Sequence, residues 1–175
     1  MENRVNHREV EQLTEQLLDL LCEHLAAHRE LAEVLEEKER AVVALELELL
    51  DEIVERERAI INRIGVLEER RCALTERIGK LIEHPDPTSL RLSGIVPYVS
   101  PELADTLIDI REELRNTADR IEKIQDRNRV LIQHSLDHIH LFLSVVSGVD
   151  SALKDYSPHG PEPGTASPTV LDRRL

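Results

Sequence analysis

Apolar residues recur at alternating steps of three and four residues along two long stretches of this chain. The later stretch shows the pattern most strictly. Its seam consists of Leu103, Leu107, Ile110, Leu114, Thr117, Ile121, Ile124, Asn128, Leu131, Ser135, His138, Phe142 and Val145. Steps of this kind keep one side of an α-helix turned toward a neighbouring helix. The seam therefore predicts a helix over about residues 101–147 that packs lengthwise on another helix.

A longer and more charged seam occupies about residues 9–83. It consists of Leu18, Leu21, Leu25, His28, Ala32, Leu35, Glu39, Val42, Glu46, Leu49, Ile53, Arg56, Ile60, Arg63, Leu67, Arg70, Leu74, Arg77 and Leu81. The stretch lacks proline and Gly65 is its only glycine, so one helix, continuous or softly bent at Gly65, is predicted. This helix would be much longer than the second one, and its overhang must stay bare, fold back or meet another molecule.

Residues 84–99 form a connector between the two predicted helices. The sequence HPDP at residues 84–87 ends the first helix, because proline lacks an amide hydrogen and crowds the residue before it. Thr88–Ile95 is predicted to form a short helix. Ser100 followed by Pro101 is a helix start, since serine can cap the first turn and proline fits it without losing a hydrogen bond.

Together these elements predict an all-α protein. The expected fold is an elongated antiparallel helical hairpin or bundle with coiled-coil-like packing, formed by residues 1–154. A content of 2% aromatic and 33% charged residues suits long amphipathic helices better than sheets. Residues 155–175 are rich in Pro, Gly and Ser, so they are expected to form a flexible C-terminal tail that is disordered in isolation.

Composition also disfavours some classes of partner. The formal net charge of -13 repels nucleic acid and anionic membrane surfaces. No uncharged apolar run reaches the roughly 18 residues that a membrane span needs, so no membrane insertion is expected. The polar N-terminus and the lack of any close pairing between Cys22 and Cys72 favour a cytoplasmic protein with reduced thiols.

Enzyme motifs are absent from the sequence. It has no Gly-rich phosphate loop, nucleophile elbow or Cys-x-x-Cys pair, so no catalytic residue and no cofactor are expected. His24 with His28 and His134 with His138 have the i, i+4 spacing that can hold zinc. Polar-face or seam positions on helices account for these pairs more simply, and no metal site is predicted. The stretch Glu68–Arg71, with both charge signs, is interpreted as a solvated helix face.

The segment Asn128–Val146 holds two apolar rows. One is the continuing seam, which includes Phe142. The second row consists of Ile132, Leu136, Ile139, Leu143 and Val146. A helix with one neighbour needs one row, so the second row predicts either another neighbour within the fold or a partner protein. Asn128 lies in the seam and is predicted to fix the register of packing as a buried polar residue.

This combination of features resembles the FlgN family of flagellar type III export chaperones. The resemblance is strongest in NRVLIQHSL at residues 128–136, an Asn followed by apolar residues and Ser-Leu. Gln125 departs from the family pattern, which often has a second Asn there. Tyr156 followed by SPHG matches the family's tail, and the charged stretches at residues 55–58 and 67–71 match its first helix.

The resemblance implies a chaperone that binds hook–filament junction proteins, the FlgK- and FlgL-like hook-associated proteins, and prevents their premature aggregation. It implies delivery of these clients to the gate and ATPase components of the export apparatus, without cofactor or turnover. The family binds its client through the C-terminal part. The partner-binding candidates implied here are Leu136, Ile139, Phe142, Leu143 and Val146. The family's tail tyrosine contacts the gate protein FlhA, and Tyr156 would have that role.

A self-associating helical coiled-coil adaptor with no export client is the main alternative. Both apolar rows would then be covered within a homo-oligomer, and a mass measurement at several concentrations distinguishes this possibility from a chaperone. A metal-dependent helical-bundle enzyme is a third possibility, and metal analysis of the purified protein tests it.

Overall fold

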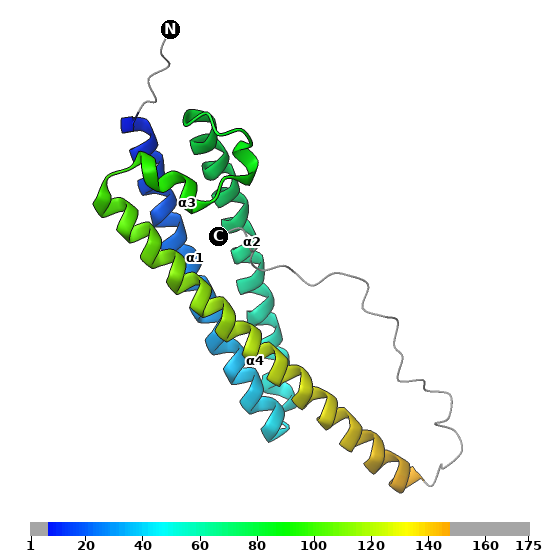
Figure 1. Ribbon diagram of the computed structural model, residues 1–175. Helices are drawn as coiled ribbons and strands as arrows, with labels where there is room; N and C mark the ends of the chain where they lie inside the picture. The colour runs from blue at the N-terminus through cyan, green and yellow to red at the C-terminus, as the bar shows by residue number, and fades with distance from the viewer. Residues whose placement is uncertain (1–6, 148–175) are drawn as a thin grey trace.

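The computed structural model describes residues 7–147, and all regular secondary structure within that range is helical. It confirms an elongated all-α bundle with coiled-coil-like packing (Figure 1). The elements are α1 His7–Ala44, α2 Leu47–Leu81, the 3-10 helix η1 Pro87–Ser89, α3 Leu92–Ile95, the 3-10 helix η2 Val96–Tyr98 and α4 Pro101–Ser147. The predicted tail, residues 155–175, lies outside the described residues.

The expectation of one continuous helix over residues 9–83 is wrong. The chain reverses at Leu45 and Glu46, which separate α1 from α2. Leu45 adopts a left-handed conformation with φ 58, and the amide of Glu46 donates to the carbonyl of Ala41 at 3.0 Å. The amide of Leu45 donates to Val42 at 3.2 Å, which completes a Schellman-type helix end. The predicted overhang therefore folds back as α2, and Gly65 lies inside α2.

The central helix of the bundle is α1, which packs along both α2 and α4, whereas the backbones of α2 and α4 do not run in contact with each other. The hairpin makes α1 and α2 antiparallel, and α4 runs in the same direction as α1 (Figure 1). Three ion pairs tie α4 to α1 with partners that advance together along both helices. They are Arg29–Glu113, Glu36–Arg120 and Glu39–Arg127.

The connector closes one end of the bundle. Glu83 has φ 54 and the His84 amide donates to the Gly79 carbonyl at 2.9 Å, so α2 ends in the same way as α1. The Asp86 side chain accepts from the Thr88 amide at 3.2 Å and caps η1. A Cβ on Gly79 would lie 2.8 Å from the Pro87 Cα, so only glycine allows η1 to pack this closely on α2.

Buried side chains form two successive clusters along the bundle. The first cluster joins the N-terminal part of α1, the end of α2, the connector and the start of α4. The second, the lower core cluster, joins the C-terminal part of α1, the first two thirds of α2 and the middle of α4. The α4 seam supplies the residues predicted for it: Leu107, Ile110, Leu114, Ile121, Ile124 and Asn128 are all buried. Asn128 is the last buried residue of α4 within the described range, and α4 continues beyond the α1–α2 turn (Figure 1).

Candidate protein-binding site

Large apolar side chains are exposed along the end of α4. Leu136 is 45% exposed and Ile139 is 44% exposed, whereas Leu107 and Leu114 in the same helix are 0% and 1% exposed. Phe142 and Leu143 are more exposed still. Because scattered apolar residues are ordinary on surfaces but contiguous ones are not, this end of α4 is a candidate interaction surface.

The structure brings four of the predicted partner-binding residues together on this end of α4. Leu136, Ile139 and Leu143 follow one another at steps of three and four residues, and Phe142 lies on the adjacent seam. Val146 lies within α4, but its side chain is outside the described part of the structure. Tyr156 also lies outside the described residues.

A hollow of about 310 Å³ lies where α4 passes the α1–α2 hairpin. Leu35 and Lys38 of α1 and Glu57 of α2 line it from one side. The α4 residues that line it are Gln125, Asn128, Arg129, Ile132 and Gln133. Lys38 donates to Glu57 at 2.8 Å, so these two charges neutralise each other at the wall of the hollow.

Asn128 is 4% exposed, and its amide nitrogen donates to the carbonyl of Leu35 at 2.8 Å. Its Oδ1 atom is buried and accepts no hydrogen bond from any described residue. A buried amide oxygen without a donor is costly, and such groups are rare in folded proteins. The sequence placed Asn128 in the seam, but it could not show that the Oδ1 atom of the side-chain amide would lack a hydrogen-bond donor among the described residues.

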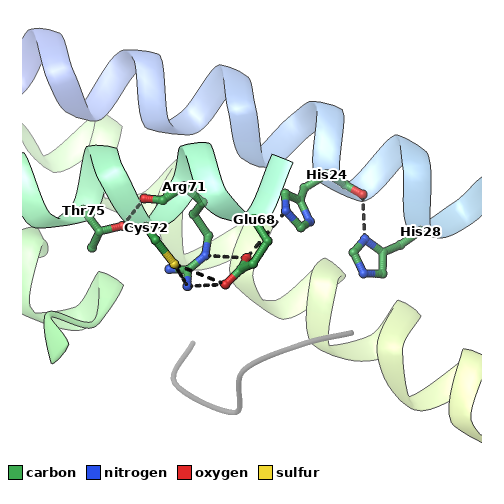
Figure 2. A network of polar contacts seen from close by, with 6 residues as sticks. All are labelled: His24, His28, Glu68, Arg71, Cys72 and Thr75. Carbon is green, nitrogen blue, oxygen red and sulfur yellow. Dashed lines mark hydrogen bonds and ion pairs between the residues drawn. The ribbon is translucent and has the colours of Figure 1, made fainter. Parts of the chain in front are cut away.

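A second polar cluster links α1 to α2 away from the exposed end of α4 (Figure 2). His24 is buried, and its Nε2 atom lies 3.6 Å from Glu68 Oε2. The guanidinium of Arg71 donates to Glu68 through Nε at 2.8 Å and through Nη2 at 2.7 Å. His28 stacks on His24 with ring centroids 5.2 Å apart. The interpretation of Glu68–Arg71 as a solvated face is wrong for Arg71, which is 8% exposed.

The electrostatics of this cluster favour a structural link. Burial and the neighbouring His28 lower the pKa of His24 from 6.5 to about 4, although Glu68 acts in the opposite direction. Burial raises the pKa of the Glu68 carboxyl, but the hydrogen bond and charge of Arg71 outweigh it and lower that pKa below its ordinary value. Near neutral pH, a neutral His24 therefore faces an ionised Glu68 that Arg71 compensates.

Within residues 7–147, no three His, Cys, Asp or Glu side chains converge as a metal ion requires. His24 and His28 occupy the buried interface, where packing accounts for their spacing. In the same range, no helix has an apolar stretch both long and uncharged enough to cross a membrane.

The structure is an elongated helical bundle with an exposed apolar helix end, which is a candidate surface for binding another protein. A family model described as FlgN protein matches residues 10–164. The chain belongs to the FlgN family, whose members are flagellar export chaperones. No curated protein and no solved structure matches the chain.

Proposed function

We propose that this chain is a cytoplasmic chaperone that binds FlgK- and FlgL-like hook–filament junction proteins, prevents their premature aggregation and delivers them to the flagellar export apparatus. The observation that supports this most directly is the exposed apolar end of α4 in a member of a chaperone family. The proposed client-binding residues are Leu136, Ile139, Phe142, Leu143 and Val146. Tyr156 is proposed to contact FlhA when the loaded chaperone reaches the export gate.

The proposed mode of binding is a client helix laid along the second row of α4. An amphipathic helix presents its own apolar side chains at steps of three and four residues, which match the spacing of Leu136, Ile139 and Leu143. Full burial of an apolar side chain contributes about 1.5–3 kcal/mol. Leu136, Ile139, Leu143 and Val146 together would contribute about 6–12 kcal/mol, and an association cost of about 4 kcal/mol or more leaves an affinity no tighter than about micromolar.

The test compares two exposed apolar residues of α4 in a pull-down of purified FlgK-like protein. Leu136→Asp introduces a charge on the proposed client surface. Ile108→Asp introduces the same charge at 46% exposure on the same helix, alongside the covered part of the bundle. We expect Leu136→Asp to abolish recovery of the client and Ile108→Asp to leave it unchanged. If both variants keep their helical circular dichroism and recover the client equally well, this end of α4 does not bind the client.

A truncation after Gly148 separates the helical surface from the tail. Retention of the junction protein by the truncated chain places recognition on α4 and leaves Tyr156 for the export gate. Loss of the client on truncation places essential contacts beyond residue 148. Recovery of nothing except further copies of the chain would favour the self-associating adaptor instead.

A further inference from the structure

The groove between α2 and α4 has two walls and a floor, all formed by described residues. Its floor is α1, which contacts both flanking helices while they do not run in contact with each other. The hollow beside Asn128 lies in this groove and has residues of all three helices in its lining. In a four-helix bundle, a further helix would occupy such a position.

The α2 wall of the groove is apolar on both sides of Glu57. Three apolar residues share the stripe of Glu57 on the helix, because they lie at helical spacings from it. Leu50 is seven residues before Glu57, Val54 is three residues before it, and Ile61 is four residues after it. Val54 is 38% exposed, while Leu50 and Ile61 are partly buried against the lower core cluster. Because Glu57 is neutralised by Lys38, this stripe offers an apolar surface to an incoming helix.

The α4 wall begins in the hollow and continues outward as the second row. Ile132 lines the hollow, and Leu136 and Ile139 follow it at steps of four and three residues. The ion pairs with α1 come from the other flank of α4, where Arg120 and Arg127 contact Glu36 and Glu39. The second row therefore faces the same side as the hollow, toward α2.

We propose that the client docks as one amphipathic helix in the groove between α2 and α4, with an uncharged side-chain donor of that helix bonded to Asn128 Oδ1. This inference rests on the proposed function, because family membership supplies a client as the occupant. It adds a second wall, the Leu50–Val54–Ile61 stripe of α2, and a polar contact that fixes the register of the client.

The chemistry of the occupant follows from the two walls. Both are stripes with helical spacing, and ridges of this kind interlock best with another helix. The interior amides of a helix already bond within it, so only a side chain can donate to Asn128 Oδ1. Lys38, Arg129 and Glu57 line the hollow, so its lining has more positive than negative charge and disfavours a cationic donor. The client helix is therefore expected to have one Asn, Gln, Ser or Thr within its apolar stripe.

The first test compares two exposed valines of α2 in the full chain. Val54→Glu places a charge on the proposed wall. Val66→Glu places the same charge nine residues beyond Glu57, half a turn around the helix, at 49% exposure. With purified FlgK-like protein titrated against each variant, we expect affinity to fall about tenfold or more for Val54→Glu and to stay unchanged for Val66→Glu. Docking on α4 alone predicts no effect from either change.

The second test replaces the buried amide. Asn128→Leu removes the acceptor and fills its place with an apolar side chain, so thermal stability is expected to hold or rise, as it does when core asparagines of coiled coils are replaced. Client affinity is expected to fall at the same time. Lower stability with unchanged client affinity would assign Asn128 a purely structural role and would overturn the proposed polar contact.

The remaining outcomes separate this inference from the function it rests on. If Leu136→Asp abolishes client binding while Val54→Glu and Asn128→Leu do not, the chaperone proposal stands and the groove is overturned. If the unmodified chain fails to bind the junction protein, both are overturned. If Val54→Glu changes the mass of the chain in light scattering without changing client affinity, a second copy occupies the groove and the inference is wrong.

Discussion

From its start to about residue 133, α4 lies beside the α1–α2 hairpin, and its end continues past the α1–α2 turn (Figure 1). The same seam continues through both halves of the helix, with apolar residues at steps of three and four. In the first half Leu107, Leu114 and Ile124 are buried, whereas near the end of the helix Phe142 and Val145 are exposed. The pattern therefore marks a surface for helix packing in both halves, while the length of the hairpin decides which half remains available to another molecule.

The largest expected effect comes from truncating one leucine in each half of α4. Leu114→Ala should lower the free energy of unfolding by about 2–5 kcal/mol, because the 1% exposed side chain leaves a cavity. Leu136→Ala should lower it by less than about 1 kcal/mol, since that side chain is already partly in water. Urea denaturation followed by circular dichroism measures both. Similar losses for the two variants would mean that the second half is covered in solution.

The next prediction concerns the pH dependence of stability, which is expected to come from the buried His24. The pKa of His24 is about 4 in the folded chain and 6.5 in the unfolded one, so between these values the unfolded chain binds more protons. The free energy of unfolding should therefore fall as pH is lowered from 6.5 to about 4, by up to about 3 kcal/mol. The groups that face His24 are His28, Glu68 and Arg71.

Two variants isolate the contribution of His24. His24→Leu should remove most of this slope from a series of urea denaturations between pH 4 and pH 7, because no buried imidazole remains to be kept neutral. His138→Leu, on the exposed half of α4, should leave the slope in place. An unchanged slope in His24→Leu would assign the acid sensitivity to other groups.

The seam of α4 could be predicted from the sequence because every step in it comes from one uninterrupted helix. Its buried residues from Leu107 to Asn128 are those that the heptad pattern selects. The sequence also showed that the second row exceeds what a helix needs to pack against one neighbour. Whether another helix of the fold covers this second row depends on where α1 ends, and the sequence of α4 alone does not determine that.

The reversal at Leu45 could not be predicted because it uses neither glycine nor proline. Leu45 takes the left-handed position that glycine usually occupies at helix ends. A signal existed in the charged seam positions Glu39 and Glu46, of which Glu39 pairs with Arg127 and Glu46 lies in the turn. Beyond the turn the predicted seam still selected the buried Ile53, Ile60 and Leu67, but it assigned Arg70 to the position that Arg71 occupies in the core.

The groove between α2 and α4 was beyond sequence reasoning for the same reason. Its hollow joins Lys38, Glu57 and Asn128, which come from three helices. Without the turn, residues 38 and 57 would belong to one rod and lie far apart along it. The predicted partner-binding residues therefore covered only the α4 wall, and the α2 wall became visible once the hairpin was known.

The next prediction tests the turn that sets the length of the hairpin. Leu45→Gly should raise the free energy of unfolding by up to about 1 kcal/mol, because glycine adopts a positive φ without steric cost and the lost leucine side chain is 64% exposed. Leu45→Ala should give no such gain, since alanine keeps the Cβ that causes the strain. Thermal unfolding of the two variants measures the difference, and equal stabilities would mean that Leu45 is not strained.

The smallest expected effect concerns the point at which α4 leaves α1. Arg127 Nη2 lies 3.2 Å from Glu39 Oε2, and both side chains are partly exposed. A double-mutant cycle with Arg127→Ala and Glu39→Ala should give a coupling of about 0.2–1 kcal/mol that weakens with added salt. The pair lies on the flank of α4 away from the groove, so losing it weakens the contact between α1 and α4 without changing the groove walls or the core. Client affinity should therefore change less than it does in Val54→Glu, and a larger change would show that the departure of α4 from α1 controls access to the groove.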